Sequence, residues 1–250
     1  MSEKLSKSEI TLTTYGELLY LRSKIDKPGF MIGCEPNYFD QFAKVLFFSL
    51  RKHCPWANVH FHLVDATPAN IAWLTTHDCT FSSEVTPAEY CIDPFNKVLY
   101  CCAARYFRVP DIYEDNTRVI VLDADSIMVR PLPREKFLVD LLKSSWVPVR
   151  EKGGKRKCLA SALGFGVDNV RHVFANYLKE GPYYWDKDQG ILNGMIERAE
   201  ISTMDLRYTT YRFESSRPYR RDNCYIWTAK GDDRKKSPAF IKESSKYKFL

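Results

Sequence analysis

Two aspartates, Asp123 and Asp125, follow an apolar run over residues 119–122. Four aliphatic residues in a row predict a strand that is buried on both faces of a mostly parallel sheet. Successive strand side chains alternate between faces, so both carboxylates are expected on the same side. Open α/β sheets bind ligands at the carboxyl ends of their strands, and carboxylate oxygens suit Mg²⁺ or Mn²⁺. The pattern predicts a metal site whose ion would hold a diphosphate; the alternative is a turn with two solvated acids.

Alternating strands and helices surround these aspartates. Apolar runs predict strands at 30–34, 59–64, 146–149 and 159–167, and helical spacing predicts helices at 42–50, 68–74 and 97–109. This order indicates one α/β domain over residues 29–236. It leaves residues 1–28 as an N-terminal extension, and residues 237–250 as a polar, lysine-rich tail that is expected to be poorly ordered. His60 and His62 share one strand face, but with no third ligand nearby a metal site there is not expected.

The composition is that of an ordinary globular protein, with 45% hydrophobic and 27% charged residues among 250. No apolar run is long enough to cross a bilayer, and the first residues lack a secretory signal, so a cytoplasmic location is expected. The eight cysteines form no CxxC pair, which favours free thiols over zinc. A net charge of +6 suits nucleic acid, an anionic membrane surface or an anionic small substrate. Nucleic acid is not expected, because no RNA-binding or helix-turn-helix pattern occurs, whereas the tail could contact a membrane peripherally.

Three motifs together resemble the GT-A nucleotide-sugar glycosyltransferases. They are the Asp-x-Asp at 123–125, the Gly-Phe-Gly at 164–166, and an Asp-Gln followed by Leu-Asn within 188–193. The similarity is greatest to the retaining branch, glycosyltransferase family eight, which includes glycogenin and the bacterial lipopolysaccharide galactosyltransferases. It covers about residues 29–236 and implies a Rossmann-like, mixed and mostly parallel sheet flanked by helices.

The resemblance also implies roles for particular residues. Asp123 and Asp125 would hold Mn²⁺ or Mg²⁺ against the diphosphate of a UDP-sugar, with Asp123 also near the ribose. Cys34 and Tyr38 would lie beside the uracil. Lys97 and Arg105 would face the diphosphate and the donor sugar. Asp188 and Gln189 would bind the sugar on the side where bonds are exchanged.

These roles suit the transfer of a hexose to a hydroxyl of a glycan, a lipid-linked acceptor or a protein. The leaving nucleoside diphosphate develops negative charge, which a divalent cation with Lys or Arg stabilises without a proton donor. The acceptor hydroxyl needs positioning and a group to take its proton. Retention of the anomeric configuration is implied by the resemblance alone. Trp185 adjoins this region and could stack on a sugar face, although core packing is the commoner use of tryptophan.

One segment departs from the family pattern. The family commonly supplies a third metal ligand from a C-terminal His-Phe-x-Gly-x-x-Lys segment. Here Gly231 and Arg234 match the glycine and the basic residue, but Thr228 stands where the histidine would be. A neutral hydroxyl is a poorer ligand than imidazole. We expect weak metal binding, with water completing the coordination or with Asp232 substituting.

Two other functions fit parts of the sequence. Asp123 could be the nucleophile of a haloacid-dehalogenase-type phosphatase, with a late acidic motif at 231–233. Against this, several βα units precede Asp123, and Ser126-Ile127 lacks the usual Gly-Thr. Alternatively, the chain could be a degenerate transferase fold that binds a nucleotide, a glycan or nucleic acid without turnover. Thr228 and the basic loops support that reading.

Overall fold

The structure is a computed structural model of the chain. It describes residues 9–141, 143–152, 155–204, 209–210, 224–229 and 235–248. The predicted site residues Gly231 and Arg234, together with Asp232, lie outside the described residues.

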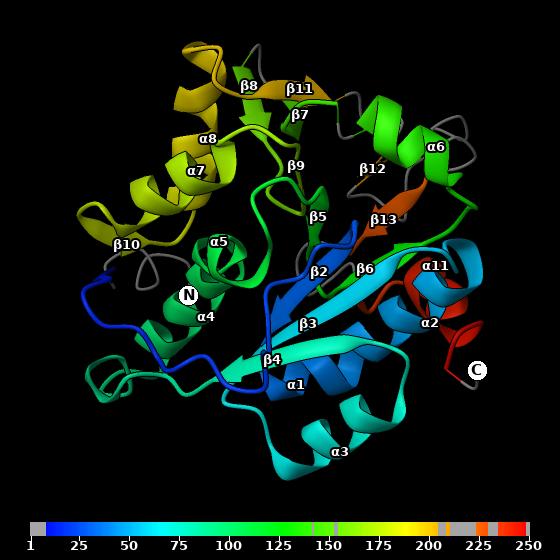
Figure 1. Cartoon of the computed structure of the whole chain (residues 1–250), viewed down its shortest axis with the longest axis horizontal. Coiled ribbons are helices and arrows are strands. Elements are labelled where there is room, and N and C mark those ends of the chain that lie inside the picture. Colours follow the sequence, from blue (N-terminus) through cyan, green and yellow to red (C-terminus); the bar gives the residue numbers. More distant parts are fainter. Residues whose placement is uncertain are drawn as a thin grey trace.

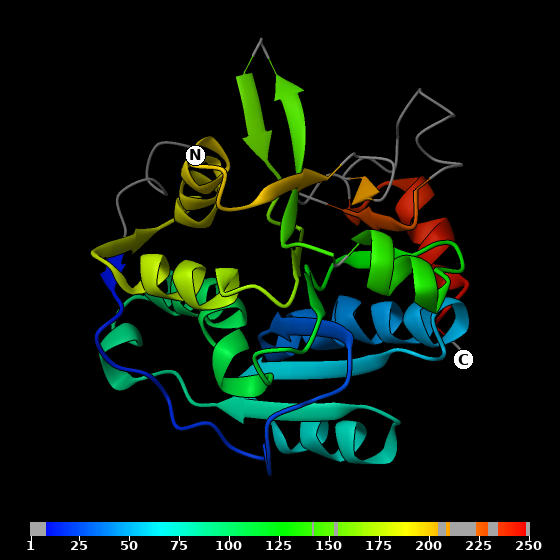
Figure 2. The same cartoon turned by 45° about the horizontal axis from the view of Figure 1, so that its top comes forward.

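A mixed sheet forms the centre of the molecule (Figure 1). In spatial order its strands are β11 (Ser202–Met204), β7 (Trp146–Lys152), β9 (Ala162–Phe165), β5 (Val119–Leu122), β2 (Gly29–Cys34), β3 (Asn58–Val64) and β4 (Thr80–Glu84), with β8 (Lys155–Cys158) paired to β7. The pairs β5–β2, β2–β3, β3–β4 and β11–β7 are parallel, whereas β9 runs antiparallel to both β5 and β7. The prediction of a mixed, mostly parallel sheet is confirmed. Figure 2 shows the β7–β8 hairpin standing out from the body of the molecule.

Helices cover both faces of the sheet. One face packs against α4 (Pro94–Phe107), α5 (Val109–Ile112), α7 (Val170–Lys179) and α8 (Lys187–Glu197). The other packs against the π-helical turn Phe39–Ala43, α2 (Lys44–His53), α3 (Pro68–Thr76) and the π-helical turn Phe137–Leu141. The short helices α1 (Pro36–Tyr38) and α6 (Arg134–Lys136) lead into the two π-helical turns, and a 3₁₀ turn, Ala88–Tyr90, precedes α4. Strand β2 is apolar throughout because both of its faces are covered. Met31 faces the first group of helices, and Phe30 and Ile32 face the second.

Two small sheets flank the main one. Strand β6 (Ser126–Met128) pairs antiparallel with β13 (Ile226–Thr228), which pairs with β12 (Thr209–Thr210). Strand β1 (Glu9–Thr11) pairs antiparallel with β10 (Pro182–Tyr184), the strand that leads into α8. The chain therefore leaves the central sheet after β5 and enters a second sheet almost at once.

The C-terminal tail is helical where it is described, which corrects the expectation of poor order. Helix α11 (Pro238–Ser245) begins with Ser237, whose hydroxyl accepts a hydrogen bond from the Phe240 amide. Phe240 and Tyr247 then pack with Trp227 in a small core beside α2. Phe240 and Tyr247 bury apolar surface that holds the helix in place, which the lysine-rich composition of the tail did not indicate.

The segment before β2 runs along the edge of the sheet and over α4 (Figure 2). Leu19 exchanges two backbone hydrogen bonds with Ser83 of β4, and Ile25 bridges to Tyr113. Gly16 donates its amide to the hydroxyl of Tyr100 on α4. This segment covers the edge strand, which would otherwise offer unpaired backbone groups.

His60 and His62 are buried and structural. Their four ring nitrogens contact Thr80, Ser82 and Glu84 on β4 at 2.9–3.0 Å. Glu84 also accepts hydrogen bonds from Arg108 and Tyr100 of α4. The histidines therefore link β3 to β4 and, through Glu84, to α4.

Candidate functional site

The two aspartates bracket a tight turn between the two sheets. Strand β5 ends at Leu122, and β6 begins at Ser126. The Asp123 amide donates to the Ser161 carbonyl, and the Asp125 carbonyl accepts from the Ala229 amide, at 2.9 Å each. The expectation that both side chains project from one continuous strand is wrong, because the chain changes sheets between them. The turn nevertheless lies where predicted, at the carboxyl end of a buried parallel strand.

Arg105 joins Asp123 to Asp188. It lies in the last turn of α4, and its guanidinium donates to the Asp123 carboxylate and lies 3.7 Å from Asp188 Oδ2. Burial alone would lower the pKa of Arg105, but the neighbouring Asp123 raises it, so the guanidinium stays charged. Three residues predicted for the site thus form one cluster, although they come from three different parts of the fold, namely α4, the end of β5 and α8.

Gly33 makes this approach possible. A Cβ atom at Gly33 of β2 would lie 2.3 Å from Arg105 Cβ and 2.9 Å from its Cα. No side chain fits there, so the glycine allows α4 to pack close to β2 at the position that carries Arg105. The sequence signal was a glycine inside an otherwise apolar strand.

Asp125 is buried and paired with Lys235. Its Oδ2 lies 3.2 Å from Lys235 Nζ, and this ammonium also donates to the hydroxyl of Tyr38. Burial and the nearby Asp123 raise the pKa of Asp125 to about 6, against the opposing effect of Lys235. Burial works against the charge of Lys235 as well, but Asp125 and Tyr38 outweigh it and raise the pKa of the lysine. This pair could not be predicted from the sequence, because Lys235 lies in the basic run at 234–236, and such runs are typical of solvated loops.

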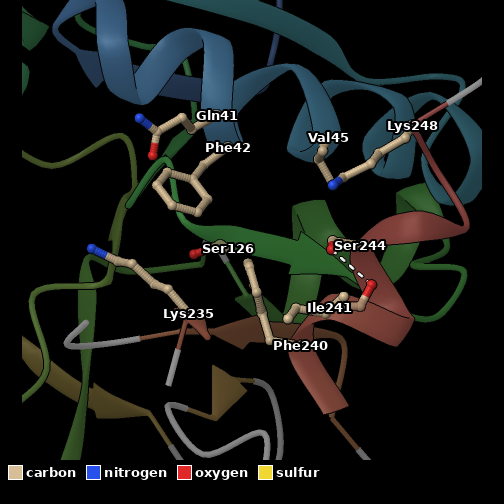
Figure 3. Close-up of a pocket in the computed structure, with 9 residues that line it drawn as sticks. All are labelled: Gln41, Phe42, Val45, Ser126, Lys235, Phe240, Ile241, Ser244 and Lys248. Atoms are coloured by element: carbon tan, nitrogen blue, oxygen red, sulfur yellow. Dashed lines mark hydrogen bonds between the residues drawn. The ribbon is translucent and has the colours of Figure 1, made fainter. Parts of the chain in front are cut away.

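A small pocket opens beside Lys235 (Figure 3). It has a volume of about 100 Å³ and lies between the start of α2, β6 and α11. Figure 3 shows Lys235 and Phe42 at one end of the pocket, next to Ser126, and Ser244 and Lys248 at the other. The Lys235 ammonium lies 4.5 Å from the Tyr38 ring centroid and 5.4 Å from that of Phe42, within cation–π range.

The N-terminus of α8 carries Asp188 and Gln189. Asp186, just before the helix, has a positive φ of 72°, and its carboxylate accepts a hydrogen bond from the Gln189 side-chain amide. Asp188 is buried and accepts from the backbone amide of Gln189 at 2.7 Å. A non-glycine residue in the left-handed region is uncommon and concentrates at functional sites.

Lys187 fixes this end of α8. Its buried ammonium donates to the carbonyls of Leu178, Glu180 and Gly181, which end α7. Burial lowers the pKa of Lys187, and the three carbonyls offset the cost of its burial. Further along α8, Asn193 accepts from the backbone amide of Cys158 at 3.2 Å. These contacts lock the helix that presents Asp188 against α7 and β8.

The other predicted residues lie at the same edge of the sheet or near it. Cys34 ends β2 and is buried, which raises the pKa of its thiol. Tyr38 follows on α1 and is partly exposed. Lys97 instead pairs with Asp65 at the end of β3, at 2.7 Å, and this hydrogen bond raises the pKa of Lys97. Its contact with a donor stays a prediction.

Comparison with known proteins identifies the fold. No protein-family model and no curated protein sequence matches the chain. Among solved structures, the galactosyltransferase LgtC in complex with donor and acceptor sugar analogs matches at 16% identity, with a TM-score of 0.56, over 88% of this chain and 97% of LgtC. The glycosyltransferase GlyE of Streptococcus pneumoniae TIGR4 matches at 14% and a TM-score of 0.58, over 87% of this chain and 61% of GlyE. The chain has the GT-A glycosyltransferase fold.

The bifunctional glycosyltransferase WbbM is a third match, at 13% identity and a TM-score of 0.58, over 91% of this chain and 51% of WbbM. The chain therefore spans about half of WbbM and nearly all of LgtC. An active-site mutant of LgtC, with glutamate in place of glutamine, is a further match, at 15% identity and a TM-score of 0.57, over 88% of this chain and 97% of that chain. Within the described part of the chain, none of the helices has the length and apolar character needed to cross a membrane.

Proposed function

We propose that this protein is a glycosyltransferase that moves a hexose from a nucleotide-sugar, with UDP-sugars as the first donors to test, to a hydroxyl acceptor. The observation that carries the proposal is the Asp123–Arg105–Asp188 cluster at the carboxyl edge of a GT-A sheet. Asp123 and Asp188 are 65 positions apart in the sequence, and the fold brings both of them to Arg105.

The cluster suits group transfer from a nucleoside diphosphate. The bond between the anomeric carbon and the β-phosphate oxygen breaks, and a bond from the carbon to the acceptor oxygen forms. The electron pair of the broken bond stays on the diphosphate, where Arg105 lies close enough to the Asp-x-Asp turn to stabilise the charge. The acceptor hydroxyl loses its proton to the departing phosphate or to solvent. Asp188 and Gln189 would contact the donor sugar, with retention of configuration as the expected outcome.

Gln189 has a particular position in this scheme. Its side chain is held by Asp186, which places a neutral amide rather than a charge next to Asp188. The matching LgtC structure with glutamate in place of an active-site glutamine supports a role for such a residue in this fold. We expect Gln189 to bind the sugar rather than to transfer a proton.

The expected metal site must be weighed against the residues that would form it. Asp123 and Asp125 would be the ligands, but each carboxylate already faces a cation, Arg105 and Lys235 respectively. The hydroxyl of Thr228 has no exposed surface and pairs with Ser126 Oγ at 2.9 Å. No group of three His, Cys, Asp or Glu side chains suited to a metal occurs among the described residues. The described residues do not fit a resident Mn²⁺ or Mg²⁺.

Release of UDP tests the function directly. The protein is incubated with UDP-glucose, UDP-galactose and a panel of other nucleotide-sugars, and free nucleoside diphosphate is measured without and with simple glycan acceptors. Asp188→Asn is expected to reduce release by about 10²-fold or more, because it removes a charge from the reacting centre. Asp111→Asn is the matched control, since Asp111 of α5 is partly exposed and pairs with Arg108, the residue between α4 and α5. No release with any donor would contradict the proposal.

The same assay separates the alternatives. Binding of a nucleotide-sugar without release would favour the non-catalytic reading that Thr228 supports. Hydrolysis of a generic phosphoester, abolished by Asp123→Asn, would favour the phosphatase. The pairing of Asp123 with Arg105 argues against the latter, because a guanidinium bonded to a carboxylate reduces its nucleophilicity.

A further inference from the structure

Lys235 pairs with Asp125, one of the two carboxylates that the sequence predicts as metal ligands. Its ammonium lies 3.2 Å from Asp125 Oδ2, on the side of the turn that also carries Tyr38. The side chain is only 12% exposed and lies against two aromatic rings. Lys235 is thus built into the site by an ion pair, a hydrogen bond and ring contacts.

The two carboxylates of the Asp-x-Asp turn are balanced without a divalent ion. Asp123 and Asp125 contribute two negative charges, and Arg105 and Lys235 contribute two positive ones, while Asp188 is a further acid 3.7 Å from Arg105. Two carboxylates with one Mn²⁺ reach the same net charge. A divalent ion added beside Arg105 and Lys235 would meet two cations at close range, and repulsion in a partly buried site is strong.

Thr228 does not supply the histidine ligand of the family pattern. The family pattern has a histidine here, whereas the Thr228 hydroxyl is used by Ser126 and is fully buried at the end of β13. A neutral hydroxyl already committed to a hydrogen bond adds little affinity for a hard cation. Thr228 and Lys235 therefore disfavour a divalent ion at this site for two separate reasons.

We propose that Lys235 supplies the positive charge expected of a metal ion, so that this protein binds the diphosphate of its nucleotide-sugar without Mn²⁺ or Mg²⁺. This inference rests on the proposed function. Lys235 lies between Tyr38, expected beside the base, and Asp125, and its ammonium can turn from the carboxylate to a phosphate oxygen. Lys235 and Arg105 then flank the diphosphate, and both can stabilise the charge that develops when the sugar leaves.

Calorimetry of UDP binding tests the inference in the wild-type protein. The full chain is stripped of metals and titrated with UDP in millimolar EDTA, and again in millimolar Mn²⁺. We expect the two dissociation constants to agree within about threefold. Binding that is lost in EDTA and restored by Mn²⁺ would overturn the inference while leaving the proposed function intact. Absence of binding by UDP and other nucleoside diphosphates in both conditions would overturn both.

A matched pair of variants tests the residue. Lys235→Met keeps the length of the side chain and removes its charge, and it is expected to weaken UDP binding in EDTA by about 10- to 100-fold. Lys236→Met makes the same change at the next residue, which is exposed, and should leave binding unchanged. Thermal unfolding confirms that both variants fold. Equal UDP affinity of folded Lys235→Met and wild type in EDTA would overturn the inference.

Binding of Mn²⁺ itself gives a readout that does not depend on turnover. Electron paramagnetic resonance measures free Mn²⁺ in the presence of protein. We expect the wild type to bind little, and Lys235→Met to bind more, because the removal of the ammonium leaves Asp125 without its cation. Tight stoichiometric Mn²⁺ binding by the wild type would contradict the inference.

Discussion

The guanidinium of Arg105 donates a hydrogen bond to the carboxylate of Asp123. The two residues belong to a helix and to the end of a strand: α4 packs against β2, and Asp123 follows β5, the strand next to β2 in the sheet. The contact exists because Gly33 of β2 carries no side chain at the point where α4 passes. The close approach of α4 to β2 thus determines whether Arg105 can reach Asp123.

Gly33→Ala should therefore damage both the fold and the site. The new methyl would clash with the Arg105 backbone, and overpacking of this kind costs about 1–3 kcal/mol of unfolding free energy. Urea denaturation measures that loss, and UDP release should fall with it. Gly190→Ala is the control for stability, since a Cβ at Gly190 meets no atom within 4 Å and a helical alanine is favourable. Equal stability of Gly33→Ala and wild type would contradict the close approach.

Asp125→Asn should stabilise the protein while it impairs activity. Burial raises the folded-state pKa of Asp125 to about 6, above the ordinary aspartate value of 3.8, so the unfolded chain ionises first as the pH rises. The cost of the buried charge is absent at low pH, grows between these two values and is complete above pH 6. At pH 8 the free energy of unfolding of Asp125→Asn should then exceed that of the wild type by about 2–3 kcal/mol. Near pH 3.8 the two proteins should be almost equally stable. Urea denaturation at both pH values measures the difference, and a pH-independent effect would contradict it.

Lys187→Met should lower turnover without changing UDP affinity. The buried ammonium holds three carbonyls at the end of α7, and their loss leaves the start of α8 less firmly placed. We expect about 1–3 kcal/mol less unfolding free energy. The rate of sugar transfer should fall because Asp188 is the next residue. Lys242→Met, at an exposed position on α11, is the control and should behave as the wild type. A rise in the UDP dissociation constant instead would assign Lys187 to the nucleotide site.

Trp185→Ala should weaken binding of the acceptor without changing the reaction of the donor. The ring is 53% exposed, lies next to Asp186 and has Phe95 as a neighbour at 6.1 Å between centroids. Aromatic faces pack against the C–H surface of sugars, and the loss of one ring should reduce kcat/KM for a glycan acceptor by about 3- to 10-fold. Acceptor-independent UDP release should not change, and Trp185→Phe should restore most of the loss. Tyr20→Ala removes a similarly exposed ring from the N-terminal segment as a control.

The strands of the parallel core could be predicted because their burial is written in their composition. The run at 30–34 contains no charged residue, and the run at 59–64 is apolar apart from His60 and His62; they correspond to β2 and β3. Helix α4 was predicted from 97 to 109, but it begins at Pro94, because the Asp93 side chain accepts from the Phe95 amide and caps the first turn. The two aspartates could be predicted as site residues because the Asp-x-Asp motif follows a buried strand, although it lies in a turn and not in the strand itself.

What the sequence did not indicate depends on contacts between distant residues. The Asp125–Lys235 pair spans 110 positions, and the Lys97–Asp65 pair forms because the end of β3 happens to face the first turns of α4. A lysine in a basic run and a lysine in a helix look alike in sequence whether they are solvated or paired. Only the packing of α11 and β13 against β6 shows which lysine belongs to the site.

The position of Trp185 also provides an intrinsic optical probe. All five tryptophans lie in the described part of the chain, and Trp185 is the only one of them that is exposed. Its fluorescence should therefore be the part of the emission that aqueous iodide quenches most strongly, while Trp56 and Trp73 are half-buried and buried rings such as Trp146 contribute a protected background. Shielding from iodide on addition of a candidate glycan would report occupancy of the acceptor side in real time, without a label and before any product forms.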